Sequence, residues 1–192
     1  ITVANTVTAT VSAIVATGAM PVFADIEPGT MLLDVAALET MLTKLRDPKI
    51  KAVVPVHLYG QAVDMPRLMD VAGRHHLFVL EDCAQAHGSL VGGRMAGTWG
   101  QLASFSFYPT KNLGALGDAG AVTGRDAALL GQVKLLRQYG WRKRYVSDLH
   151  GRNSRLDELQ AAILRVRLTR LGAENRRRDE IAVHRGRVVR QL

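Results

Sequence analysis

The chain has 192 residues, of which 47% are hydrophobic and 22% are charged, a composition typical of globular proteins and unlike that of disordered or fibrous ones. This length allows one domain or a tight pair of domains with an ample buried core. The formal net charge of +8 leaves three classes of partner open: nucleic acid, a membrane surface or a phosphorylated small molecule.

The single cysteine, Cys83, excludes an internal disulfide and favours a reducing compartment, so we expect a cytoplasmic protein. The apolar residues 1–23 include Asn5, several threonines and Gly18, and therefore suit a buried strand and helix better than a membrane span. A start at Ile1, directly in a strand-like segment, predicts that the sequence belongs to a longer chain.

Strand-like and helix-like segments alternate along the sequence. In chain order we expect a strand at 20–26, a helix at 35–46, a strand at 51–56, a helix at 64–75, strands at 77–82, 102–107 and 120–124, a helix at 126–138 and a long helix from about residue 154. Strands that alternate with helices indicate an α/β domain with a mainly parallel sheet that is buried on both faces.

The last predicted helix has its own start signal, because the hydroxyl of Ser154 can cap a first turn. Its apolar stripe at helical spacing is Leu156, Leu159, Ile163 and Val166. The basic tail at 170–190 carries acidic residues at helical spacing, which favours an exposed helix face.

Polar side chains follow the apolar runs at the points where the predicted strands end. In a parallel sheet, ligands bind beyond the carboxyl ends of the strands, so these side chains are candidate site residues. They are Asp25, His57, Tyr59, Asp82, Gln85, Tyr108 and Lys111. Several strand ends that supply polar groups to one crevice predict a binding site.

Lys111 follows the alternating segment SFSF at 104–107, in which the serines would face one side and the phenylalanines the core. The alternative is a solvated loop lysine, as most lysines are. A lysine amine can form a Schiff base with a carbonyl compound. A pyridoxal phosphate site needs such a lysine, a carboxylate for the ring nitrogen and donors for the phosphate. Asp82 and Ser106 suit the last two roles.

Three longer motifs then occur in a distinctive order: VLEDCAQAHGS at 79–89, SFSFYPTKNLGALGDAGAV at 104–122 and GRNSRLDELQAAILRVRL at 151–168. With the early segment 4–30, they make the chain resemble the DegT/StrS family of sugar aminotransferases. The resemblance extends to about residue 180. It implies a fold-type I large domain, pyridoxal 5′-phosphate as cofactor and nucleotide-linked keto-sugars as substrates.

The resemblance also implies a role for each matching position. Lys111 would hold the cofactor covalently, and Asp82 would pair with its pyridine nitrogen. Gln85 would lie near the cofactor's hydroxyl face, and Ser106 would bind its phosphate. These four residues form the expected core of the cofactor site.

Further contacts follow from the same resemblance. Thr6 and Val7 occupy the segment that covers the ring, where the family usually has an aromatic residue in place of Val7; an aliphatic side chain stacks less strongly there. Asn153 would reach the phosphate of the cofactor in a neighbouring subunit, so the resemblance implies a homodimer with shared sites. Residues expected to contact the substrate are Tyr108, His57, Tyr59, Arg142 and Lys143.

The motif WRKRY at 141–145 has three readings. Cations between aromatic residues can bind single-stranded nucleic acid, and they can also form a plain solvated loop. The resemblance favours a loop near the substrate's diphosphate, where arginine suits phosphate geometry. Since no nucleic-acid-binding motif accompanies the charge, we expect no nucleic acid partner.

The histidines do not predict a metal site. Apart from the adjacent pair His75–His76, they lack close ligand spacing on one element, and Cys83 is the sole thiol. We expect His57 and His87 to lie near the cofactor as polar lining, and we assign no metal.

The expected function is transfer of an amino group from an amino acid, with glutamate as the expected donor, to C3 of a dTDP-3-keto-6-deoxyhexose. A C4-aminating enzyme is the alternative within the class, whereas the family's sugar dehydratases carry histidine in place of Lys111. A catalytically inactive relative that binds cofactor or nucleotide-sugar as a sensor is the alternative outside it.

Residues 1–153 are expected to form the central part of the large domain, and 154–192 a long helix that leads into a small C-terminal domain. The family's phosphate-binding turn at a helix N-terminus would lie upstream of Ile1. We therefore expect a domain truncated at both ends, and expect residues 1–192 alone to be an incomplete enzyme.

Overall fold

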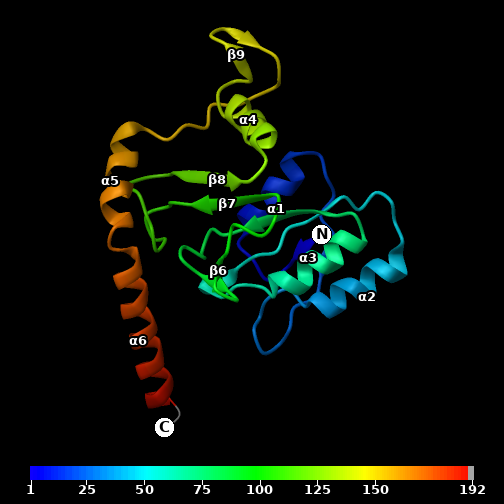
Figure 1. The fold of residues 1–192 in the computed structure, drawn as a ribbon, viewed down its shortest axis with the longest axis vertical. Helices are drawn as coiled ribbons and strands as arrows, with labels where there is room; N and C mark the ends of the chain where they lie inside the picture. Colours follow the sequence, from blue (N-terminus) through cyan, green and yellow to red (C-terminus); the bar gives the residue numbers. More distant parts are fainter. Residues whose placement is uncertain (190–192) are drawn as a thin grey trace.

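The computed structural model describes residues 1–189, with the side chains of the last helix described up to His184. A twisted sheet with adjoining helices forms the body of the molecule, and a hairpin and a long helix extend from it (Figure 1). Within this described part, no helix combines the length and the apolar character needed to cross a membrane.

The central sheet has the strand order β3–β4–β7–β8. Its strands are β3 (Ala52–Val53), β4 (Phe78–Asp82), β7 (Leu102–Ser106) and β8 (Gly120–Gly124). The first three strands are parallel, and β8 is antiparallel to β7. The mainly parallel α/β arrangement predicted from the alternating pattern is thereby confirmed.

Two short parallel strands, β1 (Thr2–Val3) and β2 (Phe23–Ala24), adjoin the sheet at β3. The Val54 amide donates to the Ile1 carbonyl oxygen over 2.8 Å, which places β1 next to β3. The strands predicted at 20–26 and 51–56 are shorter than expected. At β3 the reason is Pro55, which has no N–H for the ladder, so pairing resumes only as a single bridge between Val56 and Asp82.

Four helices accompany the sheet: α1 (Thr8–Ala16), α2 (Val35–Leu45), α3 (Met65–Arg74) and α4 (Ala127–Leu136). The predictions at 35–46, 64–75 and 126–138 are confirmed. Each of these three helices begins after an aspartate whose carboxylate accepts backbone N–H groups of the first turn, namely Asp34, Asp64 and Asp126.

The main core lies between α2, α3 and the sheet. Its fully buried side chains include Leu38, Val53, Met65, Leu68 and Val79. A smaller cluster under the ends of β4 and β7 consists of Cys83, Ala86, Ala96 and Ala103. A third, of Leu113, Ala115 and Leu164, attaches the C-terminal helices to the body.

The long helix expected from Ser154 consists of two helices, α5 (Glu158–Leu168) and α6 (Leu171–Val189), so that prediction was wrong in its start and its continuity. The Ser154 amide instead donates to the Arg137 carbonyl oxygen over 2.9 Å. This bond and the adjacent bridge between Gln138 and Asn153 hold the segment extended, so the helix cannot start there.

The predicted stripe on α5 was also wrong in part. Leu159 and Val166 are 73% and 60% exposed, and the fully covered side chain is Leu164. Within the part of the chain that the structure describes, the helix packs on one small cluster, against which Leu156 also lies, so a single narrow face is covered. Residues 190–192 of the predicted C-terminal region lie outside the described residues.

Candidate active site

Asp82 ends β4 at the carboxyl edge of the parallel strands. In the sheet register it stands opposite Ser104 of β7 and bridges to Val56 beyond β3. Its half-buried carboxylate accepts two hydrogen bonds: Oδ1 from the Ala84 amide at 3.1 Å and Oδ2 from the Thr10 hydroxyl at 2.8 Å. An ionised carboxylate has about four lone-pair sites, so Asp82 retains capacity for another donor.

Thr10 brings the first turns of α1 to this edge of the sheet. Its side chain is buried, and its Oγ1 lies 2.8 Å from Oγ1 of Thr6 as well as from Asp82. The predicted cofactor residue Thr6 is therefore connected to Asp82 through Thr10. Val7, the residue before α1, is 53% exposed at the start of the same helix.

Gln85 lies three residues after Asp82 and is oriented by the backbone of a neighbouring turn. The Tyr59 amide donates to Gln85 Oε1 over 2.7 Å, so the side-chain NH₂ group faces elsewhere. Tyr59 and Gly60 both have positive φ, 58° and 82°, in the short 3₁₀ turn Leu58–Gly60. The Tyr59 side chain is 82% exposed, as an accessible substrate contact would be.

Lys111 lies in a tight turn after β7. Its amide donates to the Tyr108 carbonyl oxygen over 2.9 Å, and its side chain is half-buried. A side chain at Gly114 would lie 2.5 Å from the Pro109 carbonyl oxygen, so the turn requires glycine at that position. Ser106 ends the strand before this turn, and the Tyr108 side chain is half-exposed beyond it.

The side chain of Asn175 on helix α6 hydrogen-bonds to the same turn. Asn175 Nδ2 donates to the His87 carbonyl oxygen over 2.7 Å, and Asn175 Oδ1 accepts from Asn112 Nδ2 over 2.9 Å. Asn112 directly follows Lys111, and His87 lies in the turn after β4. One amide on α6 therefore joins the two turns on either side of the site.

The neighbour of Asp82 in β4 has a different environment. Glu81 is fully buried and accepts four hydrogen bonds. The donors are the amides of Gly97 (2.8 Å), Trp99 (2.7 Å) and Gly100 (2.8 Å) and the His57 ring nitrogen Nε2 (3.1 Å). Burial favours the protonated carboxyl, but the His57, Gly100 and Gly97 bonds together outweigh it, so the pKa of Glu81 lies below its usual range.

His57 does not line the site, contrary to our expectation. It is fully buried, and its Nδ1 accepts from the Val63 amide at 3.1 Å. A backbone N–H can only donate, so the proton of the neutral ring is on Nε2, which donates to Glu81. His57 thus binds Glu81 on the interior face of β4, and it is not among the proposed substrate contacts.

Two other buried groups near β4 have shifted pKa values. Burial raises the pKa of the Cys83 thiol, and the charges of Glu81 and Asp82 add to this shift. Burial lowers the pKa of His87, whose ring packs between Phe105 and Phe107 at centroid distances of 5.7 and 5.9 Å. Both groups are therefore held in their neutral forms.

One group of potential metal ligands occurs in the described residues: His57, Glu81 and Cys83 lie within 4.8 Å of one another. All four lone-pair sites of the Glu81 carboxylate are already used by protein donors, and His57 uses both ring nitrogens. The arrangement is a hydrogen-bonded interior cluster, and we assign no metal to it.

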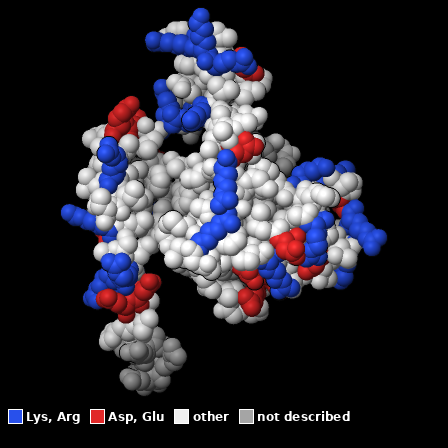
Figure 2. Space-filling model, viewed as in Figure 1, with Lys and Arg blue, Asp and Glu red and all other residues white. Residues whose placement is uncertain are grey.

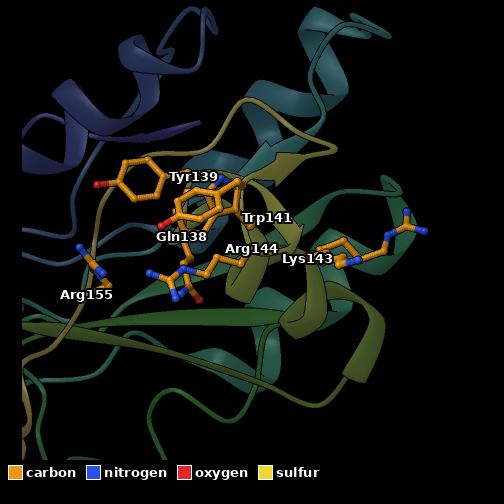
Figure 3. Close-up of a pocket in the computed structure, with 8 residues that line it drawn as sticks. Gln138, Tyr139, Trp141, Lys143, Arg144 and Arg155 are labelled. Carbon is orange, nitrogen blue, oxygen red and sulfur yellow. The ribbon is translucent and has the colours of Figure 1, made fainter.

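The hairpin after α4, built from β9 (Trp141–Lys143) and β10 (Val146–Ser147), stands away from the sheet (Figure 1). Basic side chains gather over this end of the molecule (Figure 2). The rings of Tyr139 and Trp141 lie 5.0 Å apart, with the guanidinium of Arg155 over Tyr139 (Figure 3). The predicted residue Arg142 forms an exposed ion pair with Asp148, and Lys143 is exposed.

Asn153 lies beside this hairpin rather than in the Lys111 turn. It pairs with Gln138 after α4, and its Oδ1 accepts from Arg155 Nε over 2.7 Å. Among the hydrogen bonds of residues 1–189, none joins Asn153 to Asp82, Ser106 or Lys111.

Sequence reasoning missed Thr10 and the role of Glu81. Thr10 follows Thr6 by four residues, the spacing at which side chains meet on one helix face, and this was the available signal. For Glu81 the signal was weaker: an acidic residue within an apolar strand that must find partners if buried.

The family model of the DegT/DnrJ/EryC1/StrS aminotransferase family matches residues 1–190. The chain is 51% identical over 174 residues to the dTDP-3-amino-3,4,6-trideoxy-alpha-D-glucose transaminase of Micromonospora megalomicea subsp. nigra. A transaminase of the same name from Streptomyces venezuelae is 46% identical over 170 residues. These alignments cover 90% and 88% of this chain but 46% and 44% of the relatives, so the chain spans about half their length.

Solved structures give the same relationship. S. venezuelae DesV, in complex with a ketimine intermediate, superposes with a TM-score of 0.87 at 45% identity, over 93% of this chain and 47% of that protein. A DegT/DnrJ/EryC1/StrS aminotransferase from Brucella abortus gives a TM-score of 0.93 at 33% identity, over 100% and 52%. The chain belongs to the DegT/DnrJ/EryC1/StrS aminotransferase family.

Proposed function

We propose that the chain is the cofactor-binding part of a pyridoxal-phosphate-dependent sugar aminotransferase. The observation that carries the proposal is the arrangement at the carboxyl ends of β4 and β7. Asp82 there keeps unused lone pairs, and the half-buried Lys111 and the hydroxyl of Ser106 follow the adjacent strand. These groups fit the cofactor, which needs an amine, a carboxylate and phosphate donors.

When bound, pyridoxal phosphate supplies the electron sink that makes the α-carbon of an amino acid acidic. Lys111 would hold the cofactor in the resting protein and, when free, remove and return protons at the α-carbon. Asp82 would keep a proton on the ring nitrogen, and Ser106 would donate to the phosphate. Gln85, whose oxygen is engaged by Tyr59, would present its NH₂ group to the cofactor's hydroxyl face.

The proposed acceptor is C3 of a dTDP-linked 3-keto-6-deoxyhexose, with glutamate as donor. Support comes from the relatives named dTDP-3-amino sugar transaminases, at 51% and 46% identity. Tyr59 and Tyr108, both exposed near the strand ends, would contact the sugar. A C4-aminating activity is the competing proposal, because a GDP-perosamine synthase of Caulobacter vibrioides is 40% identical.

We also propose a cytoplasmic homodimer with shared sites. The hairpin extends from the body and carries the exposed Arg142 and Lys143, which would reach the diphosphate of a substrate bound to the other subunit. Asn153, beside the hairpin, would contact the phosphate of the cofactor there. Thr6 and Val7, at the start of α1, would complete the cofactor site within each subunit.

A regulatory role is the second candidate function, and specific relatives favour it. The chain is 46% identical both to the erythromycin biosynthesis sensory transduction protein EryC1 of Saccharopolyspora erythraea and to a pleiotropic regulatory protein of Geobacillus stearothermophilus. A protein of this kind could bind cofactor or nucleotide-sugar without amino transfer.

One experiment separates these functions. The full-length protein is loaded with pyridoxal phosphate and mixed with glutamate alone, and the cofactor absorbance is followed. An aminotransferase converts the cofactor to its aminated form without any sugar, whereas a sensor leaves the spectrum unchanged. Adding dTDP-3-keto and dTDP-4-keto sugars separately then identifies the acceptor.

The lysine assignment has a direct chemical test in the same protein. Borohydride reduction followed by peptide mapping should place the trapped cofactor on Lys111. Lys111→Ala should abolish the adduct, and the matched variant Lys44→Ala, on the surface of α2, should retain it. An adduct on another lysine contradicts the proposal.

A further inference from the structure

The buried hydroxyl of Thr10 has a chemical environment that the proposed roles do not yet use. Thr10 is 8% exposed and is the buried residue of α1, a helix whose other side chains are largely accessible. It donates to Asp82 across 72 residues of sequence, over 2.8 Å. A buried polar group held at this distance from a half-buried carboxylate contributes to how that carboxylate is oriented.

The direction of the hydrogen bonds follows from proton counting. An ionised carboxylate accepts only, so Thr10 uses its single hydroxyl proton on Asp82 Oδ2. The contact between Thr6 and Thr10, also 2.8 Å, must then be a bond that Thr6 donates. The three groups form one directed chain from Thr6 through Thr10 to Asp82, in which each bond strengthens the next.

Two donors from different elements fix the plane of the Asp82 carboxylate. The Ala84 amide, in the turn after β4, holds Oδ1, and Thr10, on α1, holds Oδ2. With both oxygens held, rotation about the Cβ–Cγ bond is restricted, so the unused lone pairs keep a fixed orientation. Removal of either donor would allow the plane to turn.

We propose that Thr10 is a positioning residue that orients Asp82 toward the cofactor's ring nitrogen. The inference rests on the proposed function, because it takes Asp82 as the partner of that nitrogen. Thr10 acts through Asp82 alone, and its own hydroxyl has no proton left for another acceptor. Thr6, two residues before the start of α1, supports the same orientation through its hydrogen bond to Thr10.

The test uses full-length protein and three variants on one helix. Thr10→Val removes the hydroxyl and keeps the side-chain shape, Thr10→Ser keeps the hydroxyl, and Thr8→Val is the matched control at an exposed position of α1. We expect Thr10→Val to weaken cofactor binding and to slow the glutamate half-reaction, each by roughly tenfold, the scale observed when outer-shell partners of metal ligands are lost. Thr10→Ser and Thr8→Val should behave as the unmodified protein.

A double-mutant cycle with Asp82→Asn distinguishes positioning from a general structural role. If Thr10 acts through Asp82, Thr10→Val should have little further effect on cofactor dissociation in the Asp82→Asn background. Additive losses would overturn the inference. So would an unchanged dissociation constant in Thr10→Val, or a failure of Thr10→Ser to restore it.

The outcomes also separate this inference from the proposed function. Protein that binds cofactor but leaves glutamate unreacted contradicts amino transfer, while the dissociation constants still test Thr10. Protein that binds no pyridoxal phosphate overturns both. If Thr10→Val does not fold, judged by circular dichroism, Thr6→Val is the second variant, and an unchanged dissociation constant there overturns the directed chain.

Discussion

Glu81 and Asp82 are consecutive carboxylates in one strand. They face opposite sides of the sheet, and their oxygens differ in how many hydrogen bonds they accept from the protein. Glu81 is fully buried, and four protein donors occupy its oxygens. Asp82 is half-buried at the strand end, with one donor on each oxygen. The first is closed to any ligand, and the second remains open to one.

The difference shows how a sheet separates stabilising from binding functions by the alternation of side chains along a strand. The Glu81 side contacts the turn 97–100, whose amides converge on one carboxylate. The Asp82 side contacts α1, which supplies a single hydroxyl. Protein donors hold both carboxylates in place, but only Asp82 keeps lone pairs that no donor of the described residues uses.

The strongest test of this contrast is Glu81→Gln. The amide NH₂ group would face backbone N–H donors, so at least one hydrogen bond is replaced by a donor–donor contact in the interior. We expect a loss of about 3–5 kcal/mol in the free energy of unfolding, as for other broken buried charge networks. Urea unfolding measures it, with the exposed Glu158→Gln as control; a loss no larger than the control's would show that the network does not stabilise the fold.

Gly100→Ala tests the Glu81 side of the sheet by changing the turn 97–100, whose amides bind that carboxylate. A methyl group there would lie 2.6 Å from the Val79 carbonyl oxygen, and backbone atoms cannot move aside as a flexible side chain can. We expect a destabilisation of about 1–3 kcal/mol, the usual cost of overpacking. Thermal unfolding measures it, and Gly29→Ala, where a methyl group meets open space, is the control.

Acid should reduce the stability that the buried Glu81 carboxylate contributes to the fold. The pKa of folded Glu81 lies below its ordinary value of 4.5, so its contribution to stability is present above about pH 4.5 and is lost as the pH falls through the folded value. The difference in unfolding free energy between the unmodified protein and Glu81→Gln should therefore be constant near neutral pH and shrink below pH 4.5. A difference that grows in acid contradicts this sign.

Asp82→Asn should have the smallest effect on stability and a severe effect on the proposed chemistry. The site is half-buried and an amide can still accept from Thr10, so we expect a change within about 1 kcal/mol in urea unfolding. The glutamate half-reaction should be severely slowed, because an amide cannot keep the ring nitrogen protonated. Near-normal half-reaction kinetics would show that Asp82 is not its partner.

The sequence predicted the alternation of elements well, because local patterns carry that information. Capped helices such as α2 and the apolar strand β4 have periodicities that tertiary contacts did not override. The placement of Asp82 and Lys111 at adjacent strand ends followed from the parallel order of the sheet.

What escaped prediction depends on contacts between distant residues. His57 follows an apolar run as the proposed site residues do, and only the position of Glu81, 24 residues on, shows that it faces inward. The extended segment before α5 likewise depends on pairing with Gln138 rather than on its own propensities. Periodicity alone cannot distinguish these cases, since it contains no information on which distant groups meet.

The Asn175 side chain has a mechanical consequence. Its amide bonds both the turn after β4 and the turn that carries Lys111, at 2.7 and 2.9 Å. Both bonds leave from one side chain, so a shift of α6 at this residue acts on both turns at once. A displacement of α6 would therefore move the turn after β4 and the turn that carries Lys111 together.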